Sequence, residues 1–83
     1  MFDKLRQLKQ LKDLQDSLKE EKIETEKNGV RIVMNGNFQI EEISLNPNLK
    51  KEDQEKALKD CLNKAVQEIQ LKVAQRMSSI WKI

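Results

Sequence analysis

The residue types that most often carry catalysis are scarce in this sequence. It has no histidine and no tyrosine, and Cys61 is its only cysteine, so neither an internal disulfide nor a His/Cys zinc site can form. General acid/base and nucleophilic mechanisms most often use His, or Cys or Ser activated by a base. The acidic pairs, such as Glu20-Glu21, are neighbours in sequence, so their carboxylates point apart on a helix or strand. We therefore predict no catalytic residue, no metal site and no cofactor.

The remaining chemistry is that of charge, because basic residues gather at both ends of the sequence. Residues 1–12 carry four basic residues and one acidic residue, and residues 64–83 carry the same numbers, so each segment has a net charge of +3. Residues 13–63 have eight basic and twelve acidic residues, a net charge of −4. Lys and Arg that neutralise phosphates bind DNA without any motif that reads bases. For any single lysine, the alternative is a solubilising residue on an amphipathic helix.

Two long helices are predicted to position these charges. Leucines recur every three or four residues in residues 2–24, which is typical of an amphipathic helix. A second apolar series predicts a helix over residues 51–81, and Glu52 and Asp53 suit the positive end of its dipole. Short connections would bring the two helices back antiparallel, with the start of the first beside the end of the second. The two basic segments would then form one phosphate-binding surface.

This predicted DNA-binding set consists of the basic residues near the two chain ends. Its members are Lys4, Arg6, Lys9, Lys12, Lys72, Arg76 and Lys82. Trp81 is flanked by apolar residues, so we interpret it as a packing residue, with Phe2 as a partner if the ends meet. Cys61 stands beside the apolar series of its helix and is expected to be a small buried hydrophobe, since no cation is clearly placed to activate its thiol.

Residues 24–46 predict a small antiparallel sheet of two or three strands. Apolar residues alternate from Val30 to Met34, and Asn35-Gly36 predicts a type I′ turn that pairs Val33 with Phe38. Asn28-Gly29 is interpreted as the end of the first helix, with residues 23–27 a weaker candidate for an edge strand. This register puts apolar side chains on both faces of the sheet, and the chain's own helices can cover only one.

The second apolar face, together with a chain too short for a large core, predicts a homodimer. The residues assigned to its interface are Val30, Ile32, Met34, Phe38 and Ile40. With 83 residues, the chain fits a single α+β domain over residues 1–83. The lone cysteine and the lack of an apolar leader or of a run long enough to span a membrane lead us to expect a cytoplasmic protein.

Several short motifs resemble those of the YbaB/EbfC family of bacterial nucleoid-associated proteins. They are the Asn35-Gly36 hairpin, the strand end at residues 43–47 (ISLNP), the stretch 58–60 (LKD) followed by Ala65, and the opening residues 1–12. The resemblance covers nearly the whole chain. It implies a tweezer-shaped homodimer whose helices project from a shared sheet and bind double-stranded DNA. Because the family offers no catalytic motif, the DNA-binding role falls on the basic helix positions.

The sequence thus indicates a homodimer that binds double-stranded DNA with little sequence preference, as a nucleoid-associated or regulatory protein. The alternative is a protein-interaction module, such as a chaperone-like adaptor that clamps a polypeptide between its helices. Its support is the length of the apolar series, which could serve a client as well as a second copy. No membrane and no small-molecule substrate is expected as a partner.

Overall fold

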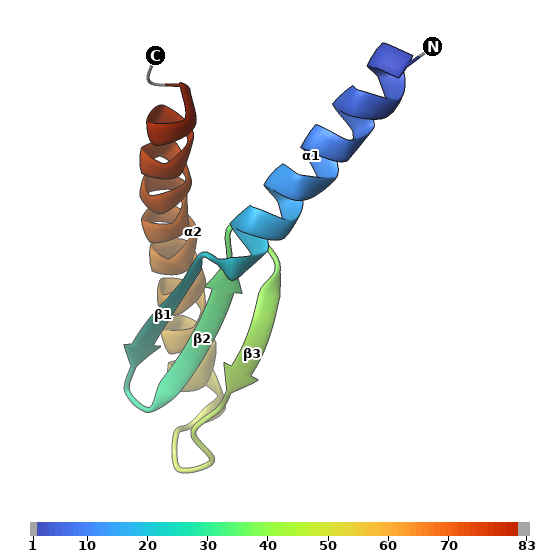
Figure 1. Cartoon of the computed structure of the whole chain (residues 1–83). Coiled ribbons are helices and arrows are strands. Elements are labelled where there is room, and N and C mark those ends of the chain that lie inside the picture. The colour runs from blue at the N-terminus through green and yellow to red at the C-terminus, as the bar shows by residue number, and fades with distance from the viewer. Residues whose placement is uncertain (1, 82–83) are drawn as a thin grey trace.

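The computed structural model describes residues 2–81. Along the sequence, a three-stranded sheet lies between two helices. These elements are α1 (Phe2–Glu20), β1 (Lys22–Lys27), β2 (Val30–Asn35), β3 (Ile40–Ser44) and α2 (Lys51–Trp81) (Figure 1). The sheet is antiparallel in the order β1-β2-β3. The predicted α+β class, with its long first and last helices, is therefore confirmed. The first helix ends at Glu20, before the expected residue 24, because the chain turns into β1.

The core lies between one face of the sheet and one side of α2 (Figure 1). Small residues that recur every four positions let α2 approach the sheet closely. The buried residues at this contact are Val30, Ile32 and Met34 of β2, and Ala57, Cys61, Ala65 and Ile69 of α2. Thr25 of β1 joins them by donating a hydrogen bond from its hydroxyl to the Cys61 carbonyl oxygen at 2.9 Å. The predicted burial of Cys61 is confirmed.

Neither Asn-Gly pair has the role that the sequence suggested for it. Asn28 and Gly29 have φ values of 53° and 84° and join β1 directly to β2, the positive-φ pair that a two-residue hairpin favours. In the β2–β3 turn, by contrast, Asn35 ends β2 and the positive φ, 60°, belongs to Phe38. The type I′ turn expected at Asn35-Gly36 is therefore wrong, and that loop is longer than two residues.

The longer loop changes the pairing between β2 and β3. Val33 pairs with Glu42 and Met34 with Ile40, with an irregularity between Val33 and Met34. The predicted pairing of Val33 with Phe38 is consequently wrong. Residues directly opposite each other point to the same face, so Ile40 shares a face with Met34. The opposite face keeps Val33 but carries Glu24, Arg31 and Glu42 around it, so it is more polar than the partly apolar face that was expected.

Helix α1 is attached to this body only near its C-terminal end and points away from α2 along its length (Figure 1). The amide of Gly36 donates to the carbonyl oxygens of Leu18 at 2.9 Å and Glu21 at 2.8 Å. The side-chain amide of Asn37 donates to the Gln15 carbonyl oxygen at 3.1 Å. The first half of α1 is thus solvated on all sides, and Leu5 is 64% exposed.

Candidate nucleic-acid interface

Four members of the predicted DNA-binding set lie on the projecting part of α1. Lys4, Arg6, Lys9 and Lys12 are all exposed there. None of the four forms an ion pair with another described residue. Their charges are therefore unneutralised within this part of the chain. Exposed Lys and Arg side chains without a protein partner are available to neutralise phosphates.

Lys72 and Arg76 lie in a different setting, on α2 where it passes the end of α1. Arg76 donates from Nη1 to a Glu21 carboxylate oxygen at 2.9 Å, and from Nη2 to the Ser17 hydroxyl. Lys72 donates to the Lys22 carbonyl oxygen at 2.8 Å, and its Nζ lies 3.7 Å from the Glu21 carboxylate. Both cations thus already have partners at the α1–β1 junction.

The structure does not bring these two groups together. The start of α1 and the end of α2 lie well apart in Figure 1, so the expectation that they are side by side is wrong. The physical reason is that only the C-terminal end of α1 is held, through Gly36, Asn37 and Arg76, and nothing in the described chain packs along its length. Lys82 lies outside the described residues, as do the side chains of Phe2 and Trp81 that were expected to meet.

Glu21 is the residue of this region that the sequence did not single out. It follows α1 directly, its side chain is 18% exposed, and it contacts both Lys72 and Arg76. A signal was present in the sequence. Positions 72 and 76 continue the same three-to-four-residue spacing as Ala65 and Ile69, which places them on the side of α2 that faces the sheet and α1.

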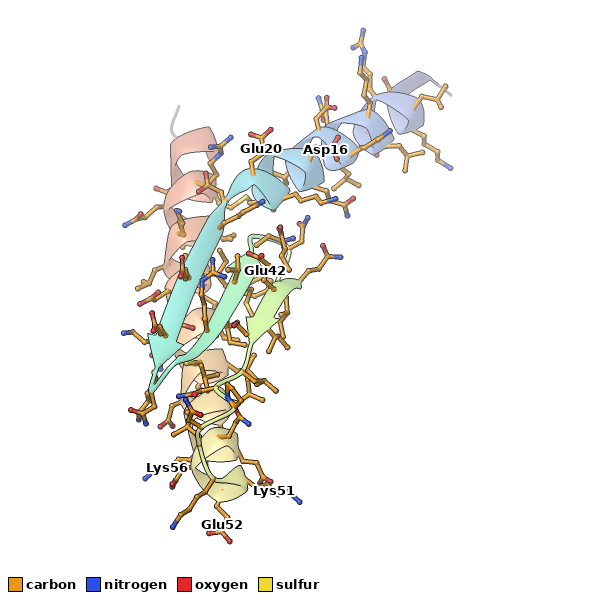
Figure 2. The ribbon with its side chains drawn as sticks, turned by 90° about the horizontal axis from the view of Figure 1, so that it is seen from below. Asp16, Glu20, Glu42, Lys51, Glu52 and Lys56 are labelled. Atoms are coloured by element: carbon orange, nitrogen blue, oxygen red, sulfur yellow. The ribbon has the colours of Figure 1, made fainter. Side chains whose placement is uncertain are left out.

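The opposite end of the molecule carries mixed charges. The start of α2 lies at the end of the sheet remote from α1, and Lys51, Glu52 and Lys56 project from it (Figure 2). Acidic residues in the first turn suit the positive end of the helix dipole. This end therefore offers no unbroken basic surface.

Three of the five residues predicted for the dimer interface are used inside the chain. Val30, Ile32 and Met34 are buried beneath α2, so they offer no surface to a second copy in this conformation. This corrects the prediction for these three residues, because the chain's own α2 covers the face of the sheet that carries them. Phe38 and Ile40 remain 49% and 44% exposed. Other apolar side chains are also exposed. They are Ile43 on β3, Leu45 just after it, and Leu5, Leu8 and Leu11 on the projecting part of α1.

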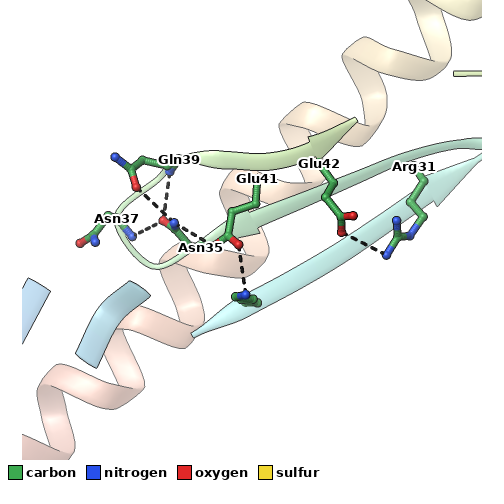
Figure 3. Close-up of polar contacts among 7 residues, drawn as sticks. Arg31, Asn35, Asn37, Gln39, Glu41 and Glu42 are labelled. Atoms are coloured by element: carbon green, nitrogen blue, oxygen red, sulfur yellow. Dashed lines mark hydrogen bonds and ion pairs between the residues drawn. The ribbon is translucent and has the colours of Figure 1, made fainter. Parts of the chain in front are cut away.

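The buried side chain of Asn35 organises the β2–β3 turn (Figure 3). Its oxygen accepts from the amides of Asn37 at 2.9 Å and Gln39 at 3.2 Å. Its side-chain amide donates to a Glu41 carboxylate oxygen at 3.0 Å. That hydrogen bond, aided by Lys22 at 3.1 Å, lowers the pKa of Glu41. The turn that holds α1 is thus itself fixed by polar contacts.

Ion pairs cross the polar face of the sheet. Arg31 of β2 pairs with Glu24 of β1 and also with Glu42 of β3. Its Nη2 lies 3.7 Å from the Glu42 carboxylate (Figure 3). The hydrogen bond from Arg31 lowers the pKa of Glu24, and the Glu24 carboxylate raises that of Arg31. Such alternation of opposite charges across strands supports the pairing register.

Comparisons with known proteins place the chain among nucleic-acid binders. The model of the YbaB/EbfC DNA-binding family matches residues 1–82. A search of curated proteins finds no match. Neither helix in the described residues has a stretch apolar enough to cross a membrane.

Proposed function

Because the chain belongs to the YbaB/EbfC DNA-binding family, we propose that it binds double-stranded DNA through phosphate contacts, with little preference for base sequence. The observation that carries this proposal is the family match over residues 1–82. The free cations of α1 support it, since they lie on a helix that stands clear of the body (Figure 2). In this proposal the protein is nucleoid-associated or regulatory and acts in the cytoplasm.

The proposed contacts run along α1 and continue to the far part of α2. Helix α1 has 19 residues, a length of about 28 Å, which spans several phosphates of a duplex. Lys4, Arg6, Lys9 and Lys12 are the primary contacts, while Lys72, Arg76 and Lys82 are assigned a supporting role. Phosphates present the same charge in every sequence, so such contacts give affinity without specificity.

A homodimer completes the proposal. Strand β3 is exposed along its whole length and forms one edge of the sheet, with Ile40 and Ile43 on its surface. An apolar edge strand can pair with another chain. A two-fold dimer would display α1 twice, and two weak grips on one duplex would strengthen each other.

A second candidate function is an adaptor that clamps a polypeptide. The exposed stripe of Leu5, Leu8 and Leu11 favours it, because an amphipathic helix can dock its apolar side into a partner's groove. DNA binding remains the better-supported proposal, because the family match and the free cations agree.

Fluorescence anisotropy with a labelled duplex at two salt concentrations tests the proposal. Binding should weaken steeply with salt, with about 0.9 added to the log–log slope for each phosphate neutralised, and unrelated duplexes should bind alike. Arg6→Glu with Lys9→Glu should abolish most binding. The matched control is Lys51→Glu with Lys56→Glu, an equal charge change at the remote end of α2, which should do much less. Equal effects of the two double variants, or no binding by the parent at low salt, would contradict the proposal.

A further inference from the structure

The side of α2 that faces the rest of the chain changes character where the helix leaves the sheet. Ala65 and Ile69 are buried against the sheet, and the partly buried Val73 still packs against this core. Lys72 and Arg76 lie beside and beyond Val73 on the same side of the helix. These two cations face the C-terminal end of α1, where both reach Glu21. The small apolar contact is thus replaced, one turn further on, by an ionic contact between the two helices.

The Glu21 carboxylate is held firmly in this position. The Glu21 amide donates to the Leu18 carbonyl oxygen at 3.1 Å, and its own carbonyl oxygen accepts from Gly36 at 2.8 Å. Its side chain is only 18% exposed, whereas that of the adjacent Glu20 is exposed on the surface of α1 (Figure 2). Both terminal nitrogens of Arg76 are occupied, one by Glu21 and the other by Ser17.

We propose that the Glu21 carboxylate competes with DNA phosphate for Lys72 and Arg76. Glu21 occupies both cations in the free protein and must be displaced before they contact a duplex. The inference rests on the proposed DNA binding and specifies how it is regulated. A carboxylate and a phosphate make the same charge-assisted hydrogen bonds to a guanidinium, so they compete for one site. In this scheme the cations of α1 make the first contact with DNA, and those of α2 follow.

Displacement also unlinks the two helices. Arg76 joins α2 to α1 through Ser17 and Glu21, so a phosphate that captures Arg76 removes this link. A carboxylate that loses its cations takes up a counterion from solution. This uptake offsets part of the counterion release from DNA and makes the salt dependence shallower than the number of phosphate contacts alone would give.

The test compares Glu21→Gln with Glu20→Gln in the full chain by anisotropy with duplex DNA. Both variants remove one negative charge, at adjacent positions, but only the first removes a partner of Lys72 and Arg76. We expect Glu21→Gln to bind about three- to tenfold more tightly than Glu20→Gln at low salt, with a steeper salt slope. Ser17→Ala frees Nη2 of Arg76 without a change of charge, while Nη1 stays on Glu21, and should tighten binding by less than Glu21→Gln does.

A double-mutant cycle separates competition from a purely structural effect. In a background of Lys72→Gln with Arg76→Gln, the gain from Glu21→Gln should disappear. Equal affinities of Glu21→Gln and Glu20→Gln, weaker binding by Glu21→Gln, or a gain that persists in that background would overturn the inference while DNA binding stands. Failure of the parent and all variants to bind at low salt would instead overturn the proposed function, and this inference with it.

Discussion

The amide nitrogen of Gly36 lies 2.9 Å from the carbonyl oxygen of Leu18, so the β2–β3 turn closes the C-terminal end of α1. A Cβ atom at position 36 would lie 2.3 Å from that same oxygen. The turn therefore needs glycine because of this close approach to backbone, and not because of a positive φ. With the hydrogen bond from Asn37 to the Gln15 carbonyl oxygen, this contact connects the β2–β3 turn to the helix that carries the free cations.

Replacement of Gly36 by alanine should loosen α1. The clash with Leu18 must be relieved by a backbone shift, which should lower the free energy of unfolding by about 1–3 kcal/mol. Trypsin cleavage at Lys12 and Lys19 within α1 should become faster in the folded protein. Gly29→Ala is the comparison, in a turn remote from α1, where the added Cβ strains a positive φ at about 1 kcal/mol and also meets the Asn46 side-chain nitrogen at 2.7 Å. An unchanged melting temperature and cleavage rate for Gly36→Ala would contradict the contact.

Enlargement of Ala65 should disturb the core. Ala65 is fully buried where α2 meets the sheet, so Ala65→Leu should lower the free energy of unfolding by about 1–3 kcal/mol through overpacking. Ala74→Leu makes the same change at an exposed position of the same helix and should be nearly neutral. Chemical denaturation of both variants measures the difference, and equal stabilities would show that α2 packs through another side.

Acid should destabilise the fold through carboxylates that are paired in it. Asn35 and Lys22 lower the pKa of Glu41, Lys27 lowers that of Asp60, and Arg31 lowers that of Glu24. The stabilisation is complete above the unfolded pKa values, near 4, and is lost as pH falls through the lower folded values.

The melting temperature should therefore drop below about pH 4, and Glu41→Gln should reduce that drop. Glu20→Gln, at an exposed position without an ion pair among the described residues, should leave the drop as in the parent. A melting temperature of the parent that stays constant from pH 7 to pH 3 would argue against these pairings.

The edge strand β3 should carry the dimer contact. Ile40→Lys with Ile43→Lys places two charges on its apolar edge. In sedimentation equilibrium, this double variant should run as a monomer or an unfolded chain and not as a dimer. Leu71→Lys is a control, because that side chain is 67% exposed and lies on α2 and not on the edge strand. A well-folded parent monomer at micromolar concentration would contradict the homodimer.

Periodicity in the sequence was enough to predict the class of fold and the course of α2 from Leu58 onward, while the start of α2 was predicted from Glu52 and Asp53 in its first turn. It could not assign the two turns, since Asn28-Gly29 and Asn35-Gly36 have the same local preference. The choice depends on packing, because Gly36 is needed against Leu18, a residue distant in sequence. The prediction that the start of α1 lies beside the end of α2 was wrong for the same reason, because the position of α1 also depends on packing. It depends on contacts of Ser17 and Glu21 with Arg76. The spacing of positions 72 and 76 indicates the side of α2 on which they lie, but not the residues that they meet there.

Because α1 is attached near one end only, a small rotation there gives a large displacement of its other end. Lys4 lies 14 residues before Leu18, about 21 Å along the helix, so a rotation of about 10° at the Gly36 contact moves it by about 4 Å. One strand of a duplex advances about 3.4 Å per phosphate. In the proposed mode of DNA binding, a small rotation at the Gly36 contact therefore moves the free end of α1 by about one nucleotide step, which lets the same four cations follow duplexes of differing curvature or groove width.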